Sequence, residues 1–154
     1  MDTFINFPGK ERVVEAVSQL KFDTLGLWGT MTPQHMLEHL LLPLQFSRGQ
    51  FEVPLVMPLD KVEKVKRIML LSDAPLKRDF VAPFIGAGLQ PLNFASFELA
   101  QTELLAETDR FLAFWEKHPE AVFTHPIFGT LNRDEWYLFH RKHFTHHFSQ
   151  FGLL

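Results

Sequence analysis

The chain has 154 residues, of which 46% are hydrophobic and 21% charged, and this length and balance are typical of one globular domain over residues 1–154 rather than of a disordered chain. Its 15 Lys and Arg against 18 Asp and Glu give a net charge of −3 with no basic run, which argues against nucleic-acid binding. The absence of cysteine excludes disulfides and thiolate metal sites, so a metal would need nitrogen or oxygen ligands. Neither a signal-peptide pattern nor an apolar run of membrane-spanning length is visible, so we expect a cytoplasmic protein without a membrane partner.

Apolar residues at helical spacing predict three helices in the first half of the chain. The first covers residues 9–20. The second begins after Thr32, which can cap a helix, with Pro33 in its first turn. The third is a shorter amphipathic helix over residues 60–71.

The second half of the chain begins with an expected long irregular connection over residues 72–91, which are rich in proline and glycine. A helix bundle with parallel neighbours needs such a crossover. A long helix follows over residues 94–118, with Ser96 as a cap and Pro119 at its end. Residues 125–129 are expected to form a turn, and Asn132 with Glu135 resembles a capping box for a last helix ending near residue 151. Because no segment alternates convincingly with period two, the predicted class is all-α.

Half of the eight histidines fall within one window of eight residues in the last helix. His143 and His147 are one helical turn apart, so their imidazoles can share one ligand, as in helical zinc motifs. A third nitrogen ligand must come from another helix, for which His39 is the leading candidate and His35 the rival. His140, on the same helix stripe as the pair, is a plausible accessory ligand.

Two other groups of side chains offer weaker signals. The carboxylate pairs Asp134 with Glu135 and Glu103 with Glu107 could act as acid and base, but acidic residues in a first turn usually complement the helix dipole. An aromatic stripe could wall a ligand pocket, although such a stripe is more often core; it comprises Phe97, Phe111, Phe114 and Trp115.

Two stretches of the sequence resemble the DinB-like superfamily of metal-binding four-helix bundles. One runs from the Trp-Gly-x-Met segment at residues 28–31 to His39, and the other from residue 125 to the His-x-x-His-His-x-x-Gln-Phe ending at residues 143–151. The resemblance implies a four-helix bundle with a long crossover and an extra short helix. It also implies His39, His143 and His147 as metal ligands. His35, His118, His125 and His146 are expected to lie outside the site, because none of them shares the stripe of the His143 and His147 pair.

The resemblance further implies a divalent cation, commonly zinc or nickel, with an open position for water or substrate. Similar proteins are mostly thiol-dependent transferases and isomerases. We therefore expect a metal-dependent enzyme, a thiol S-transferase that takes a small-molecule substrate and a low-molecular-weight thiol, with Glu38 or Gln150 as supporting groups. The alternatives are a metal-dependent hydrolase, or a non-catalytic metal-binding module whose bundle forms a homodimer.

Overall fold

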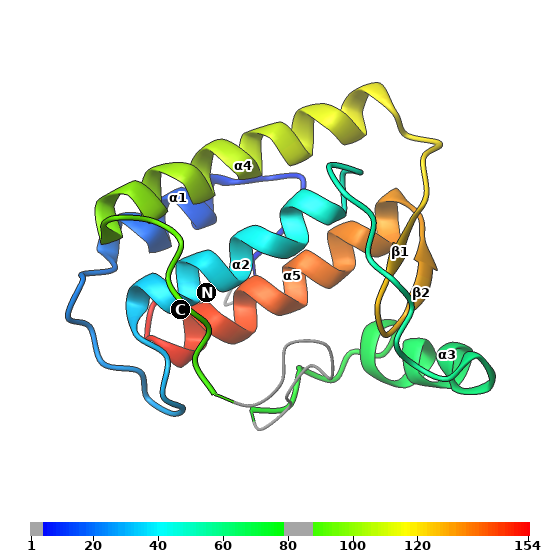
Figure 1. Cartoon of the computed structure of the whole chain (residues 1–154), viewed down its shortest axis with the longest axis horizontal. Helices are drawn as coiled ribbons and strands as arrows, with labels where there is room; N and C mark the ends of the chain where they lie inside the picture. Colours follow the sequence, from blue (N-terminus) through cyan, green and yellow to red (C-terminus); the bar gives the residue numbers. More distant parts are fainter. Residues whose placement is uncertain (1–4, 79–87) are drawn as a thin grey trace.

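The computed structural model describes residues 5–78 and 88–154, which are mostly helical with one small antiparallel sheet (Figure 1). The chain order is α1 (Glu11–Gln19), α2 (Pro33–Phe46), α3 (Leu59–Val65), the π-helical turn η1 (Lys66–Leu70), α4 (Phe97–Lys117), β1 (Phe123–His125), β2 (Gly129–Leu131) and α5 (Arg133–Gln150). The five α-helices lie close to the ranges that the apolar spacing predicts.

The predicted helix starts are confirmed by side-chain caps. The Thr32 side chain accepts a hydrogen bond from the His35 amide at the start of α2, and Ser96 accepts one from the Leu99 amide at the start of α4. At α5, Asn132 and Glu135 form a complete capping box. Each cap satisfies backbone amides that a first helical turn leaves without partners, so these residues fix where the helices begin.

Three helices run side by side through the molecule: α4, then α2, then α5, with α1 packed against α4 (Figure 1). Their facing residues form one core, whose largest fully buried members include Trp115, Trp136, Phe111, Phe144, Phe148, Met36, Leu40 and Leu44. Phe111 and Trp115 belong to the aromatic stripe of the sequence, and Phe97 and Phe114 pack against the same core. The stripe is therefore core packing.

The expectation of an all-α chain is wrong in one place, because residues 123–131 form a β-hairpin. Phe123 pairs with Leu131 and His125 with Gly129, so residues 126–128 of the predicted turn form the loop and its two end residues belong to the strands. Gly129 has φ +73°, and a Cβ there would lie 2.8 Å from Val62 of α3. Strands of three residues are too short to reveal a period-two pattern, which is why the sequence predicts only the turn.

The long connection between the first and second halves of the chain is irregular at both described ends, residues 71–78 and 88–96. The middle of the predicted crossover, residues 79–87, lies outside the described residues. Before it, the predicted third helix starts at Leu59 and changes to π-helical geometry at Lys66. No residue of α3 is buried, so this helix lies on the surface as its amphipathic pattern predicts.

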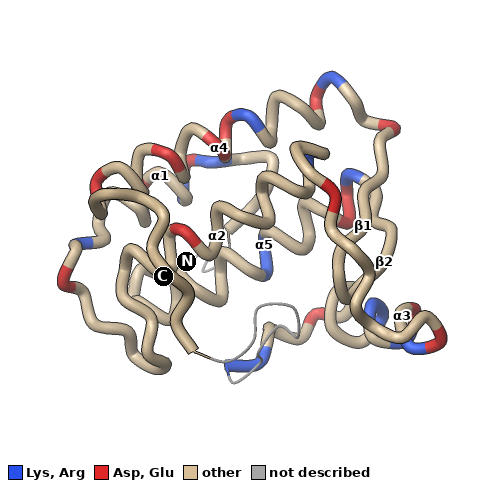
Figure 2. Tube along the Cα trace, in the orientation of Figure 1, with Lys and Arg blue, Asp and Glu red and all other residues tan. Residues whose placement is uncertain are grey.

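Charges of both signs are mixed along α4 and α3, whereas α2 carries few (Figure 2). Glu38 is the single charged residue of α2, and α5 has none after Lys142. Within residues 5–78 and 88–154, no helix has the length and apolar character needed to cross a membrane.

Candidate metal centre

Three histidines from two helices meet between α2 and α5. His39 lies in the middle of α2, and His143 and His147 lie one turn apart on α5. One ring nitrogen from each lies within 4.8 Å of the other two, and in the described part of the chain this is the one group of three or more potential ligands with such spacing. The structure therefore brings together the three residues selected from the sequence, although 104 residues separate His39 from His143.

The ring geometry suits a cation shared by the three imidazoles. The ring centroids lie 4.7 to 4.9 Å apart, at angles of 68° to 76°. His39 Nε2 and His143 Nε2 are 2.9 Å apart, slightly closer than the roughly 3.3 Å between two nitrogens on a tetrahedral zinc with bonds of about 2.0–2.1 Å. His143 Nδ1 is buried without a partner in the described structure. A small outward shift of His39 and His143 would admit an ion.

Burial keeps these histidines neutral. It lowers the pKa of His39 to about 4, with a smaller contribution from His146. Burial also lowers the pKa of His143 and of His147 well below the usual value, and the neighbouring imidazoles lower both pKa values further. Because a metal binds the lone pair of a neutral imidazole, the site does not need to lose protons before it binds an ion near neutral pH.

Gln150 determines which nitrogen of His147 faces the site. Its Nε2 amide donates to the backbone carbonyl of Trp28 at 3.0 Å, and a carbonyl can only accept, so the other atom of the amide, Oε1, must face His147. Oε1 lies 2.8 Å from His147 Nδ1, which must therefore carry the ring proton. The lone pair of His147 is on Nε2, where a metal can use it.

The loop that holds Gln150 leaves no room for a side chain at Gly29. Gly29 has φ +77°, and a Cβ there would lie 2.6 Å from Gln150 Nε2. The Leu27 amide also donates to the backbone carbonyl of Gln150 at 2.7 Å. The Trp-Gly pair at residues 28 and 29, a motif of the sequence analysis, thus positions the end of α5 and, through Gln150, His147.

The histidine group lines a cavity of about 590 Å³ between α2, α5, the hairpin loop and residues 88–93. Its wall is largely apolar and includes Leu41, Leu42, Phe46, Met69, Ile127, Phe128 and Phe139. A volume in this range holds a small organic molecule. The three imidazoles therefore face a space large enough for a small molecule, rather than a closed core.

Glu38 does not contact any of the three histidines. Its Oε1 accepts from the Asn93 amide at 2.6 Å and its Oε2 from Gln34 Nε2 at 3.0 Å. The carboxylate thus holds the chain that leads into α4 against the rim of the cavity. Of the two supporting groups expected from the sequence, Gln150 contacts a histidine of the group and Glu38 holds this chain.

The other histidines lie outside the group. His140, the expected accessory, is fully buried one turn earlier on α5 and its Nε2 lies 2.9 Å from Ser47 Oγ, so the structure does not bring it to the site. His35, the rival on α2, lies 2.6 Å from Thr32 Oγ1, and His118 contacts the Phe114 ring at the end of α4. His125 and His146 line the cavity without joining the group.

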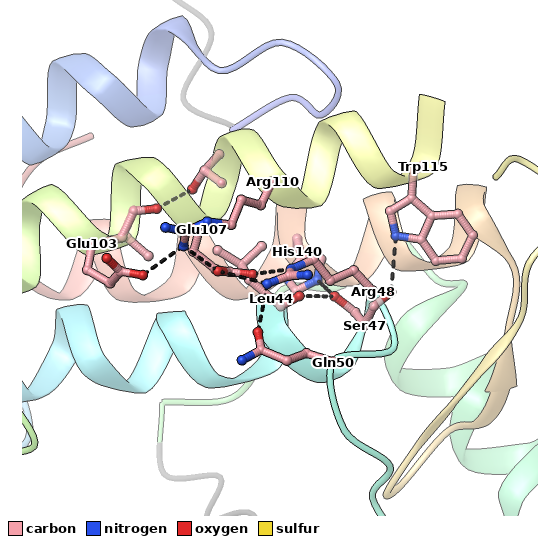
Figure 3. Close-up of polar contacts among 11 residues, drawn as sticks. Leu44, Ser47, Arg48, Gln50, Glu103, Glu107, Arg110, Trp115 and His140 are labelled. Carbon is pink, nitrogen blue, oxygen red and sulfur yellow. Dashed lines mark hydrogen bonds and ion pairs between the residues drawn. The ribbon is translucent and has the colours of Figure 1, made fainter. Parts of the chain in front are cut away.

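The carboxylate pairs considered as acid and base are engaged elsewhere. Glu135 belongs to the capping box of α5 and forms an ion pair with Lys66. Glu107 is buried between Arg48 and Arg110, and Arg110 also binds Glu103 (Figure 3). None of these carboxylates lines the cavity, so no acid and base pair is formed there.

A second buried polar cluster, which no sequence motif indicates, joins α2 to α4 and α5 next to this ion pair (Figure 3). Ser47 Oγ donates to the Leu44 carbonyl and contacts His140 Nε2, while Trp115 Nε1 donates to the Ser47 carbonyl at 3.1 Å. Ser47 lies alone in the sequence, without a local motif. Its partners come from other helices, so only the tertiary structure identifies it.

Comparison with known proteins gives one match. Residues 95–152, which cover α4, the hairpin and α5, match the model of a family described as Protein of unknown function (DUF1569). The matched segment includes His143, His147 and Gln150 but not His39. No curated protein and no solved structure matches the chain.

Proposed function

We propose that the chain is a metal-dependent enzyme of the DinB-like type, in which His39, His143 and His147 bind one divalent cation, zinc or nickel. The observation that carries the proposal is the meeting of three neutral imidazoles, with ring nitrogens within 4.8 Å, at the wall of a cavity of about 590 Å³. In this proposal α1, α2, α4 and α5 are the four helices of the bundle. Three protein ligands leave a coordination position for a reactant, as in catalytic zinc sites.

A cation in this site would lower the pKa of a bound thiol or water towards neutrality, which provides a nucleophile. The protein's own residues would do the rest. Gln150 holds His147 with its Nε2 lone pair towards the site, and the apolar walls exclude bulk water around the reactants. In the proposed reaction a low-molecular-weight thiol would lose its proton, and its sulfur would form a bond to an electrophilic carbon in the cavity. The bond from that carbon to its leaving group would break, and the leaving group would depart with the electron pair and take up a proton. The chain itself needs no cysteine for this reaction.

The size and position of the cavity favour an enzyme over a purely structural metal site. Structural zinc sites are closed by four protein ligands, whereas here three side chains meet beside an accessible space.

Metal content tests the proposal. Protein purified without added metal and analysed by atomic emission should hold about one divalent cation per chain, and His143→Ala or His147→Ala should each abolish it. His118→Ala, which removes an exposed histidine, is the control and should leave the metal in place. Stoichiometric metal in the His143→Ala/His147→Ala double variant would refute the site.

A spectrum tests the chemistry. With cobalt in the site, a small thiol should produce a sulfur-to-metal charge-transfer band that His147→Ala abolishes. If thiols of several sizes leave the cobalt spectrum unchanged while activated esters are hydrolysed, the thiol-transfer proposal is refuted in favour of hydrolysis by metal-bound water.

A further inference from the structure

His125 is a buried histidine that the proposed metal site does not use. It ends β1, is 3% exposed, and lines the cavity from the side of the hairpin. Its ring stacks on Phe128 at 4.5 Å and contacts Phe139 at 4.6 Å. A ring in such apolar surroundings needs a partner for each of its nitrogens.

One nitrogen of His125 has its partners in the hairpin loop. Nδ1 accepts from the amides of Ile127 at 3.0 Å and Phe128 at 3.2 Å. An atom that accepts two hydrogen bonds carries no proton, so the ring proton must be on Nε2. Burial lowers the pKa of His125 to about 3, so the ring stays neutral in the physiological range and Nε2–H remains a donor.

Among the described residues His125 Nε2 has no hydrogen-bond partner, and it does not belong to the fully buried atoms that lack one; because His125 lines the cavity, a ligand there can meet this donor. A donor in a largely apolar wall favours a ligand that places an acceptor against it, because a ligand that covers the donor without accepting its hydrogen costs about 1–3 kcal/mol. The walls offer little to a strongly charged ligand. Glu38 is already bonded to Asn93 and Gln34, and within residues 5–78 and 88–154 Lys77 is the one other Asp, Glu, Lys or Arg that lines the cavity.

The position of His125 sets the length of such a ligand. Phe139 contacts both His125 and the histidine group: its ring centroid is 4.6 Å from that of His125 and 5.2 Å from that of His143, on which it stacks at 24°. The ring centroids of His125 and His143 therefore lie no more than about 10 Å apart. A small molecule with one aromatic ring and a polar group at each end can reach across such a distance.

We propose that His125 is a substrate-binding residue. Its Nε2–H donates to an uncharged acceptor, such as a carbonyl oxygen, at one end of a small and largely apolar ligand whose other end is bound at the histidine group. This inference rests on the proposed metal site, and it names the class of molecule that the site takes. From the sequence, His125 is predicted only to lie in a turn and outside the ligand set.

Two thiols of nearly equal shape test the inference. The first, para-acetylbenzenethiol, carries a carbonyl acceptor, and the second, para-isopropylbenzenethiol, has a methyl group where the first has the carbonyl oxygen. Their affinities for the cobalt-loaded protein are measured by titrating the charge-transfer band. The acetyl group also acidifies the thiol, so the readout is the ratio of the two affinities compared between proteins. His125→Phe should reduce the preference for the acetyl thiol about three- to tenfold, as expected for one neutral hydrogen bond.

His118→Phe is the matched control, because it makes the same substitution at an exposed position away from the cavity, and it should leave the ratio unchanged. If the ratio of the two thiol affinities is the same in the wild type, His125→Phe and His118→Phe, the inference is overturned. The proposed metal site is not affected by that result. If cobalt does not bind at all, both the inference and the proposed function are overturned.

A second measurement needs no variant, in case His125→Phe fails to fold for lack of the Nδ1 acceptor. In the zinc-loaded wild type labelled with ¹⁵N-histidine, the acetyl thiol should move the His125 Nε2–H proton signal downfield, and the isopropyl thiol should not. Equal shifts with the two thiols would overturn the inference.

Discussion

Replacing Gln150 tests how far the metal site depends on a residue that would not touch the metal. Gln150 is 5% exposed, and its amide is held on one side by the Trp28 carbonyl and on the other by His147 Nδ1. In Gln150→Leu the His147 Nδ1–H loses its acceptor inside an apolar region. The ring can then rotate, or carry its proton on Nε2 and present no lone pair to a metal.

Outer partners of metal-bound histidines are typically worth about 10- to 100-fold in metal affinity, which corresponds to roughly 1.4–2.7 kcal/mol. In the described part of the chain, the 2.8 Å contact with Gln150 is the one hydrogen bond of the His147 ring, so we expect Gln150→Leu to weaken zinc binding by about this factor. Gln150→Glu keeps an acceptor for Nδ1–H and should retain most of the affinity.

The assay is competition for zinc with a chromophoric chelator at fixed pH. Gln101→Leu is the matched control, because Gln101 donates to the backbone carbonyls of Val17 and Leu20 on the far side of α4 and does not line the cavity. Zinc affinity of Gln150→Leu equal to that of the wild type and of Gln101→Leu, in a folded protein, would refute the positioning role.

Three further outcomes are expected. In the metal-free protein the pKa of His39 is about 4 when folded and near 6.5 when unfolded, so the unfolded state binds more protons between these values. The free energy of unfolding should therefore fall as the pH is lowered through that range, by about 1.4 kcal/mol per pH unit for each such histidine. Urea titrations in which the free energy of unfolding does not change with pH would contradict this. Arg48→Met should lower the free energy of unfolding, measured by chemical denaturation, by about 3 kcal/mol, because Arg48 is 21% exposed and binds both oxygens of the buried Glu107. Arg110→Met, at a residue 48% exposed, should lower it by less than about 1 kcal/mol. Equal losses in the two variants would show that burial does not decide the strength of these pairs. Gly29→Ala should destabilise the protein by about 1–2 kcal/mol because of its positive φ, and should also weaken zinc binding by displacing Gln150; unchanged zinc affinity would mean that the loop does not act on the site.

The parts of the structure predicted from the sequence are those determined by local rules. Helix starts depend on a cap residue and the amides that follow it, so Thr32, Ser96 and Asn132 are found at the predicted positions. The spacing of His143 and His147 is likewise a property of one helix. The choice between His39 and His35 needed more, because both lie on α2 one turn apart and only packing against α5 shows which one faces the pair.

What the sequence did not predict depends on contacts between distant segments. The hairpin strands are three residues each, below the length at which alternation is visible. His140 lies on the same helix stripe as His143 and His147, yet it contacts Ser47 at the end of α2 instead of joining the histidine group. The donor role of His125 follows from two amides of the turn after it, which donate to its Nδ1 and leave the ring proton on Nε2. The one local sign of this in the sequence is a histidine placed before a proline-containing turn.

The separation of 104 residues between His39 and His143 gives the histidine group a consequence for the folding of the whole chain. An ion held by both residues acts as a reversible cross-link, and for a covalent link that closes a loop of about 100 residues the chain-entropy estimate is about 4.7 kcal/mol. His143 and His147 lie on one helix and close no long loop between them. His39 alone of the three ligands lies on α2, so without it the two remaining histidines lie on one helix and cannot fasten α2 to α5.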